Sequence, residues 1–372
     1  MSIGSPVLRA GHLACACPED VAGRARPIPT LALALGFALV TLAQALTLGA
    51  LPLAGAMTAP RPELAGWPTA AFLLGAACAT LPALLLVDTF GRRAALAIGA
   101  GLGVAGGLAV AHALLGRSFP LLMVGAVWIG AAQGFGMFYR HAAAFGAAPG
   151  QAAGAAGRVL GAGALAGLGS PYLVALAEQL ALPYTLLGTM VLAAAAQLGA
   201  LVFAVGLREA RPALADEAAP PPRLLPFRRL LLPSLIGAAA WAAMACSMVS
   251  VPIGLAGCGV AVAGISGIVA WHVVAMYGPA LFAGHLAGWV GVRPLAGFGL
   301  AVTLAAATAG RLAGDPAVLA AALLMTGAGW AVTTAAVTGW LHEAGRLDGL
   351  RLAAHDGLVL AGAVAGAAFS LV

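Results

Sequence analysis

The segment LLLVDTFGRRAALAIG, residues 84–99, places a polar break of six residues, Asp88 to Arg93, between two long apolar stretches. These stretches, near 66–87 and 94–115, are each about as long as the roughly 20 apolar residues that cross a bilayer. The break holds one carboxylate and two arginines, which are costly to place inside a membrane. The segment therefore predicts two membrane helices joined by a tight, charged turn.

The same alternation of apolar stretches and short polar breaks fills the rest of the chain. Of its residues 62% are hydrophobic and 8% are charged, whereas a soluble domain has about 25% charged residues. This composition excludes a soluble protein and predicts an all-α integral membrane protein. Nine further spans are expected, near 30–55, 119–139, 155–177, 182–206, 230–255, 262–287, 293–312, 316–341 and 350–372. The total is about eleven transmembrane helices, six before a polar central loop and five after it.

The basic residues predict the orientation of these helices. All 18 are arginine, and if the N-terminus is inside, only Arg61, Arg117 and Arg311 fall on the outer side. Such a bias predicts a multi-pass inner-membrane protein with a cytoplasmic N-terminus. The expected parts are a disordered cytoplasmic tail (1–29), an N-terminal six-helix half (30–206), a cytoplasmic central loop (207–229) and a C-terminal half of five helices (230–372).

The residues Asp88, Gly91, Arg92 and Arg93 resemble the D-x-x-G-R-R core of the signature loop of the major facilitator superfamily. They stand where that family has the loop, between the second and third spans. The resemblance implies a major-facilitator-type bundle, in which two halves rock about a site at the membrane midplane. It also implies a charge latch on the cytoplasmic face, made by Asp88 and Arg92, although a generic positive-inside turn would look similar. The family usually has twelve spans, whereas eleven are expected here, without a C-terminal twelfth.

Two pairs of soft ligands occur on successive spans. Met244 and Met248 lie four residues apart in one span, and His272 and Met276 lie four apart in the next. Residues four apart share one face of a helix, and at about 1.5 Å per residue the two pairs overlap in depth near the middle of the membrane. Thioethers favour Cu(I), and imidazole also suits copper. The pattern predicts a copper site, although methionines in apolar helices commonly serve as packing.

The same residues, with Tyr277 and Pro279 after them, resemble the seventh and eighth helices of the CcoA-like copper importers. The segment GFGMFYRHAAAF, residues 134–145, is similar to the fourth helix of that group. The resemblance implies import of copper, as Cu(I), for the assembly of cytochrome oxidase. It implies that Met244, Met248, His272 and Met276 bind the ion and that Cys258 relays it.

Two alternatives remain open. Riboflavin importers belong to the same extended family, and Trp241, Trp271 and Tyr277 could stack on riboflavin or on another small organic solute. A non-transporting membrane sensor or a truncated relative is the other alternative. The chain shows no arrangement of catalytic residues and is not expected to be an enzyme. A copper ion would be its substrate rather than a cofactor, and no nucleic-acid partner is expected.

Several further residues are candidates for secondary roles. Met137 and His141 form another soft pair beside Arg140, which predicts either a low-affinity exit site or helix-end packing. Asp356, next to His355, is expected either to couple protons to transport or to cap its helix. The sequence assigns no role to three cysteines: Cys15 and Cys17 in the tail, and Cys78.

Overall fold

The structure is a computed structural model, and it describes residues 30–145, 147–148, 150–207 and 224–369. The expected tail and most of the central loop, with Cys15 and Cys17, lie outside the described residues. The helices are α1 (Thr30–Thr58), η2 (Pro62–Leu64), α2 (Trp67–Gly116), α3 (Phe119–Gly136), α4 (Phe138–Phe145), α5 (Ala152–Gly161), α6 (Ala164–Leu180), α7 (Leu187–Gly206), α8 (Phe227–Gly257), α9 (Val262–Tyr277), η3 (Gly278–Phe282), α10 (Ala283–Val290), α11 (Val292–Leu312), α12 (Pro316–Ala344) and α13 (Gly349–Phe369).

Helix α2 consists of two crossings that meet at Gly91. Its 50 residues would extend about 75 Å as one helix, far more than the roughly 30 Å of a hydrocarbon core. Gly91 breaks it with φ 87° and ψ 170°, a conformation that is open essentially to glycine alone. The charged turn predicted at Asp88 to Arg93 is therefore present, and Gly91 makes it possible.

Ten helical stretches among the described residues are long and apolar enough to cross a membrane, and one of them is the 55-residue stretch Pro62–Gly116. Because that stretch folds back at Gly91, the described chain makes eleven crossings, as predicted. Three other crossings are interrupted but continue in the same direction: α3 with α4, α5 with α6, and α9 with η3 and α10. The first two interruptions fall at the buried residues Met137 and Gly163, where irregular backbone is shielded from lipid. The third, η3, carries the exposed Leu281 and Phe282.

Small residues allow the helices to approach closely, as expected in lipid. On α11 and α12, a Cβ added at Gly299 would lie 2.5 Å from Oγ1 of Thr333, and one added at Gly329 would lie 2.6 Å from Oγ1 of Thr303. Side chains at either glycine would force the two helices apart. The glycine content of the sequence thus serves packing at this crossing.

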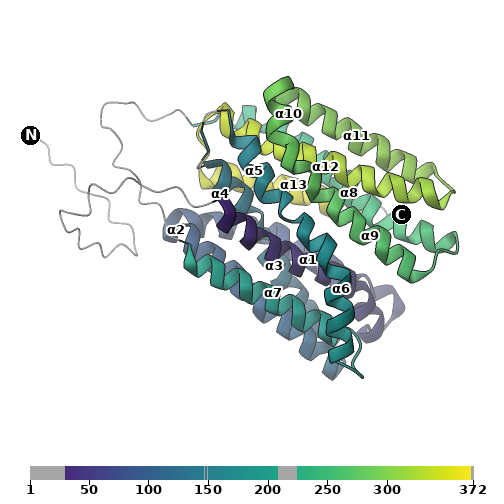
Figure 1. Ribbon diagram of the computed structural model, residues 1–372. Coiled ribbons are helices and arrows are strands. Elements are labelled where there is room, and N and C mark those ends of the chain that lie inside the picture. Colours follow the sequence, from purple (N-terminus) through teal and green to yellow (C-terminus); the bar gives the residue numbers. More distant parts are fainter. Residues whose placement is uncertain (1–29, 146, 149, 208–223, 370–372) are drawn as a thin grey trace, which may run out of the picture.

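The helices that precede the central loop and those that follow it meet along several contacts (Figure 1). Helix α2 packs on α13, α5 on α12 and η3, α6 on α9, and α4 on α12. At one end of the bundle Leu225 donates its backbone N–H to the carbonyl oxygen of Arg346, 2.9 Å away. We call this the signature-loop end, since it also holds Gly91 and the start of α13.

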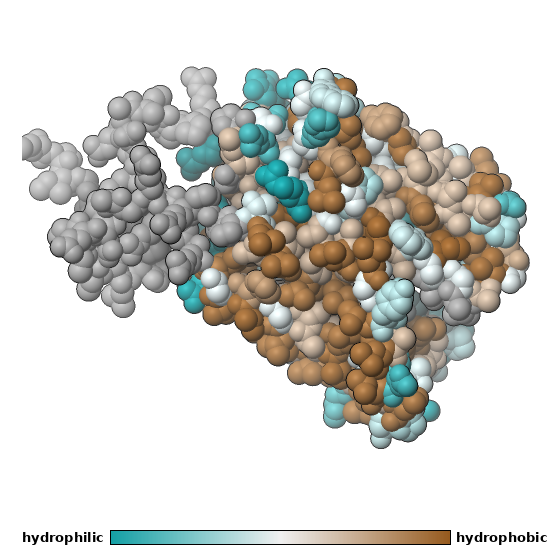
Figure 2. Space-filling view, in the orientation of Figure 1, coloured by the Kyte–Doolittle hydropathy of each residue, from teal (hydrophilic) through white to brown (hydrophobic). Residues whose placement is uncertain are grey.

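Apolar side chains cover the outside of the bundle. Figure 2 shows hydrophobic residues over most of the face drawn, while hydrophilic residues gather at the ends of the helices. Leu74, Leu108, Val202 and Phe298 are each more than half exposed. A surface of this kind suits contact with lipid tails and agrees with a multi-pass membrane protein.

Candidate functional site

His272 presents one ring nitrogen to the interior of the bundle. Its Nδ1 lies 2.7 Å from the backbone carbonyl oxygen of Leu323 on α12. A carbonyl oxygen can only accept, so Nδ1 carries the hydrogen and Nε2 of the neutral ring keeps its lone pair. That Nε2 atom is buried and has no hydrogen-bond partner among the described residues. His272 therefore offers a nitrogen that can bind a metal ion or accept a hydrogen bond.

Met276 and His272, both on α9, pack next to each other against α12. A Cβ added at Gly327 would stand 2.9 Å from Nδ1 of His272 and 3.2 Å from Cγ of Met276. Met244 is also buried, and Met248 is half-buried against the same hydrophobic core. Their helix, α8, packs mainly on α11, α12 and α13 and touches α9 only slightly. The structure thus joins His272 with Met276, while the meeting of all four donors at one ion stays a prediction.

The three cysteines of the described chain differ in exposure. Cys258 is exposed, and its Sγ lies 3.4 Å from the carbonyl oxygen of Gly314. It stands ten residues beyond Met248, about 15 Å along a helix, so it would act only as a relay. Cys246 is buried, with Nη1 of Arg311 at 3.6 Å from its sulfur. Cys78 is exposed, and nothing in the described chain gives it a role.

Four aromatic rings meet in the hydrophobic core that also contains Met276, and we call them the aromatic group: Phe37, Trp241, Tyr277 and Trp330. Phe37 of α1 contacts Tyr277 of α9 edge-on, with ring centroids 5.7 Å apart. Trp330 of α12 contacts Tyr277 at 5.7 Å and Trp241 of α8 at 5.0 Å. All four rings are buried, and Nε1 of Trp330 has no partner among the described residues.

The sequence interpretation found only part of the aromatic group. Trp241 and Tyr277 were expected near the site, but Trp271 is 59% exposed. Adjacent residues point about 100° apart on a helix, so Trp271 faces outward when His272 faces inward. Trp330 was missed, although it shares one helix face with Leu323, Gly327 and Thr334 through spacings of three and four residues.

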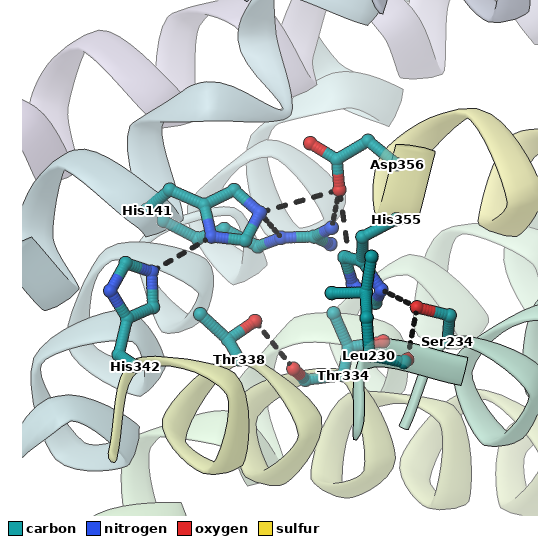
Figure 3. A network of polar contacts seen from close by, with 9 residues as sticks. His141, Leu230, Ser234, Thr334, Thr338, His342, His355 and Asp356 are labelled. Atoms are coloured by element: carbon teal, nitrogen blue, oxygen red, sulfur yellow. Dashed lines mark hydrogen bonds and ion pairs between the residues drawn. The ribbon is translucent and has the colours of Figure 1, made fainter. Parts of the chain in front are cut away.

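A second group of polar side chains lies nearer the signature-loop end, and we call it the polar cluster: Arg140, His141, Ser234, His342, His355 and Asp356. Figure 3 labels all of its members except Arg140. Nη2 of Arg140 lies 2.5 Å from Oδ1 of Asp356, and Nε2 of His141 lies 3.3 Å from the same oxygen. These three side chains are buried. They bring α4, which precedes the central loop, against α13, which follows it.

The polar cluster continues on both sides of Asp356 (Figure 3). Nδ1 of His141 lies 3.1 Å from Nε2 of His342, which is half-buried on α12. On the other side, Nε2 of His355 lies 3.9 Å from Asp356, and its Nδ1 lies 2.9 Å from Oγ of Ser234 on α8.

The secondary candidates from sequence are thus largely brought together, since Arg140, His141 and Asp356 form one network. Met137 is not part of it and packs in the hydrophobic core. Sequence reasoning missed His342, although Thr334, Thr338 and His342 recur every four residues along α12. That spacing places all three on one face of the helix.

The signature loop lies against the polar cluster. The guanidinium carbon of Arg92 stands 5.3 Å from the ring centroid of Phe145 at the end of α4. The ring of Phe145 in turn meets that of His342 at 4.6 Å. Asp88 lies at the start of α13, where a Cβ added at Gly349 would collide with its carboxylate. The N-terminus of a helix favours a negative charge, so this placement is compatible with the expected latch.

The chain is similar to known transport proteins. It is 29% identical to the riboflavin transporter RfnT of Brucella anthropi over 274 residues, 72% of this chain and 69% of the relative. No protein-family model matches it. The relative is named as a transporter rather than an enzyme, in agreement with the prediction for this chain.

Among solved structures, the chain resembles the human organic anion transporter MFSD10, with a TM-score of 0.71 and 16% identity over 96% of this chain and 93% of the other. It resembles the proton:xylose symporter XylE with a TM-score of 0.68 and 15% identity over 92% and 86% of the two chains. It also resembles the Major Facilitator Superfamily transporter FucP, with a TM-score of 0.65 and 14% identity over 92% and 90%. These likenesses establish the fold.

Proposed function

We propose that this chain, which has the major facilitator fold, is a secondary transporter that moves a planar aromatic solute, with riboflavin as the first candidate, across a bacterial inner membrane. The observation that carries the proposal is the aromatic group, whose rings come from both sides of the central loop. A flavin ring needs flat apolar contacts together with a few hydrogen-bonding groups. The likeness to a protein named as a riboflavin transporter supports the same solute.

The aromatic group offers both kinds of contact. Phe37, Tyr277, Trp241 and Trp330 supply the ring faces, and Nε1 of Trp330 is an unused donor. Nε2 of His272 is an unused acceptor beside Met276. The hydroxyl of Tyr277 donates to Oε1 of Gln44 on α1, 3.4 Å away, and thereby adds a polar link between the two halves. Separation of the halves would open these groups to one side of the membrane at a time.

The proposed orientation follows from the arginines. The signature-loop end carries Arg92, Arg93, Arg346 and Arg351 among the described residues, and this excess of basic residues supports a cytoplasmic location for it. In the proposed orientation the start of α1 lies on the same side, and Cys258 and the turn before α12 lie on the outer side.

Riboflavin uptake tests this proposal directly. A bacterium that neither makes riboflavin nor has its own importer should grow at low external riboflavin only when it carries this gene. Purified protein should show quenching of tryptophan emission by riboflavin, and Trp330→Phe should weaken it, whereas Trp289→Phe should not, because Trp289 is 73% exposed. The proposal is rejected if the gene does not improve growth and if Trp330→Phe shows the same quenching by riboflavin as the wild-type protein.

Copper is a second candidate, and one observation favours it. Nε2 of His272 is buried without a partner, and the thioether of Met276 lies beside the same ring. Cu(I) takes nitrogen and sulfur ligands of this kind. In cells that lack their own copper importer, His272→Ala should abolish labelled copper uptake and His285→Ala, at an exposed position, should not. Competition of copper uptake by excess riboflavin would show that both use one site.

A further inference from the structure

The polar cluster contains more ionisable groups than a structural ion pair needs. The groups that face one another are Arg140 and His141 of α4, His342 of α12, and His355 and Asp356 of α13, with Ser234 of α8 beside them. Ionisable residues within membrane helices are costly and usually mark a functional site. A guanidinium and a carboxylate already neutralise each other here, so the three imidazoles require a separate explanation.

The hydrogen bonds of His355 leave one nitrogen able to accept a proton. The hydroxyl of Ser234 donates its single hydrogen to the carbonyl oxygen of Leu230, 2.8 Å away. It must therefore accept from Nδ1 of His355 at 2.9 Å. In the neutral ring Nε2 is then a bare lone pair, and it faces Oδ1 of Asp356 at 3.9 Å. A proton placed on Nε2 would turn this lone-pair repulsion into an ion pair.

His141 gives the cluster a second nitrogen that a proton can occupy when Arg140 moves. Its Nε2 lies 3.4 Å from Nε of Arg140, which donates to it, and 3.3 Å from Oδ1 of Asp356, which when ionised can only accept. A neutral His141 satisfies one of these neighbours and not the other. A protonated His141 donates to Asp356 through Nε2 and to His342 through Nδ1, but its Nε2–H then opposes the N–H of Arg140. An added proton on His141 therefore favours release of Arg140.

A divalent metal ion fits the cluster less well. Ring nitrogens of His141 and His355 and an oxygen of Asp356 lie within 4.8 Å of one another. However, Arg140 donates to the same carboxylate from 2.5 Å, and its permanent charge opposes a second cation. A proton, shared along the imidazoles, is the cation that these groups can accept.

Separation of the two halves would link proton binding to movement. Arg140 and His141 belong to α4, whereas Asp356 and His355 belong to α13. If α4 moves away from α13, Asp356 loses Arg140 and becomes an unpaired carboxylate inside the membrane, which is strongly unfavourable. A proton on Asp356 or His355 removes that penalty. Protonation therefore favours the state in which the signature-loop end is open.

The polar cluster lies close to the signature-loop end. His342 is half-buried there and contacts His141 directly. A groove of about 370 Å³ at the start of α8, lined mainly by apolar side chains, reaches Ser234, and Ser234 contacts His355. A proton bound in the cluster can therefore leave toward the signature-loop end once that end opens.

We propose that His141, His355 and Asp356 form a proton-binding site between the two halves and that it couples proton entry to solute movement, an inference that rests on the proposed transport function. A proton from the outer side binds at a ring nitrogen or at Asp356, and Arg140 is released as the signature-loop end opens. The proton then leaves into the cytoplasm, and Arg140 pairs with Asp356 again when α4 returns to α13. No other bond is made or broken.

Reconstituted protein tests this site with labelled riboflavin as the probe. Two reactions are measured: accumulation driven by an imposed pH gradient, and counterflow without a gradient, which needs no net proton movement. Asp356→Asn and His355→Gln should each reduce gradient-driven accumulation by at least about tenfold and should retain counterflow, which also shows that they are folded. Asp356→Glu should restore part of the accumulation, and His285→Gln, at an exposed site, should behave as wild type.

Failure of the site and failure of the proposed function are distinguishable. Full gradient-driven accumulation in both variants would overturn the proton site, as would saturable Zn²⁺ binding that His355→Gln abolishes. If wild type shows no riboflavin counterflow, the proposed solute is wrong. The site is then judged from infrared difference spectra of purified protein between about pH 5 and about pH 8, where histidine titrates. Loss of a carboxyl band in Asp356→Asn and of an imidazole band in His355→Gln would support the site. Variant spectra identical to the wild-type spectrum would overturn it.

Discussion

Tyr277 of α9 meets Phe37 of α1 edge-on, with their ring centroids 5.7 Å apart. Because α1 precedes the central loop and α9 follows it, this contact joins the two halves of the molecule at its centre. Tyr277 also contacts Trp330 at 5.7 Å. It therefore occupies the position from which a flat solute, once inserted, would touch rings of both halves.

Removal of the Tyr277 ring should weaken transport of riboflavin. Stacking of one base-like ring on an aromatic side chain contributes about 1–3 kcal/mol, so we expect Tyr277→Ala to lower the affinity by about tenfold or more. Tyr277→Phe keeps the ring and should retain most of the activity. The measurement is initial uptake over a range of riboflavin concentrations.

Trp271→Ala is the matched control for Tyr277→Ala. It removes a ring from the same helix, but one that is 59% exposed, and it should leave uptake unchanged. Equal losses in Tyr277→Ala and Trp271→Ala would point to damage to α9 rather than to a solute site.

Gly327→Ala should disturb the other side of the central site. The added methyl group would lie 2.9 Å from Nδ1 of His272 and 3.2 Å from Cγ of Met276, so His272 must move away from the carbonyl oxygen of Leu323. Overpacking of this kind costs about 1–3 kcal/mol. We expect lower transport of whichever solute the protein carries, together with a lower melting temperature. Gly297→Ala on α11, where a Cβ meets nothing within 4 Å, should change neither quantity.

The positions of the membrane spans could be predicted from the sequence with good accuracy. The spans expected near 30–55 and 316–341 correspond to Thr30–Thr58 and Pro316–Ala344. Apolar length is a property of one segment at a time, and the bilayer sets it. The break at Gly91 was predictable for a similar reason, because the charges around it cannot lie within a span.

The contacts between spans could be predicted only in part. His141 and His342 are 201 residues apart, and no local pattern says that α4 lies on α12. The rotation of each helix is set by its neighbours, which is why Trp271 was expected near the site and is exposed. Met244, His272 and Met276 are buried, and their binding of one ion together with Met248 stays a prediction. The soft-ligand pattern could not indicate that α8 packs mainly on helices other than α9.

The ion pair of Arg140 and Asp356 should show strong coupling between its two partners. Both side chains are buried, and removal of one partner leaves an unpaired charge at a cost of about 3–5 kcal/mol. Arg140→Met and Asp356→Asn should therefore each lower the melting temperature in detergent by several degrees. The double variant should recover much of the loss, because no unpaired charge remains. Additive losses in the double variant would show that the two charges do not depend on each other.

Gly349→Ala should separate the signature loop from α13. A methyl group there would collide with the carboxylate of Asp88, so Asp88 must leave the start of the helix. The attraction between a carboxylate and a helix N-terminus contributes about 0.3–1 kcal/mol at exposed positions and up to about 2 kcal/mol when partly buried. We expect a modest loss of thermal stability and a larger loss of transport, because the contact joins the two halves at the end that must open.

Gly357→Ala, eight residues along the same helix, is the matched control for Gly349→Ala. It would place its methyl group 3.5 Å from Oγ1 of Thr80, an ordinary contact, and should change neither stability nor transport. Asp88→Asn removes the charge and keeps the shape. If it matches Gly349→Ala, the charge makes the latch; if transport is unchanged in both, Asp88 does not hold the halves together.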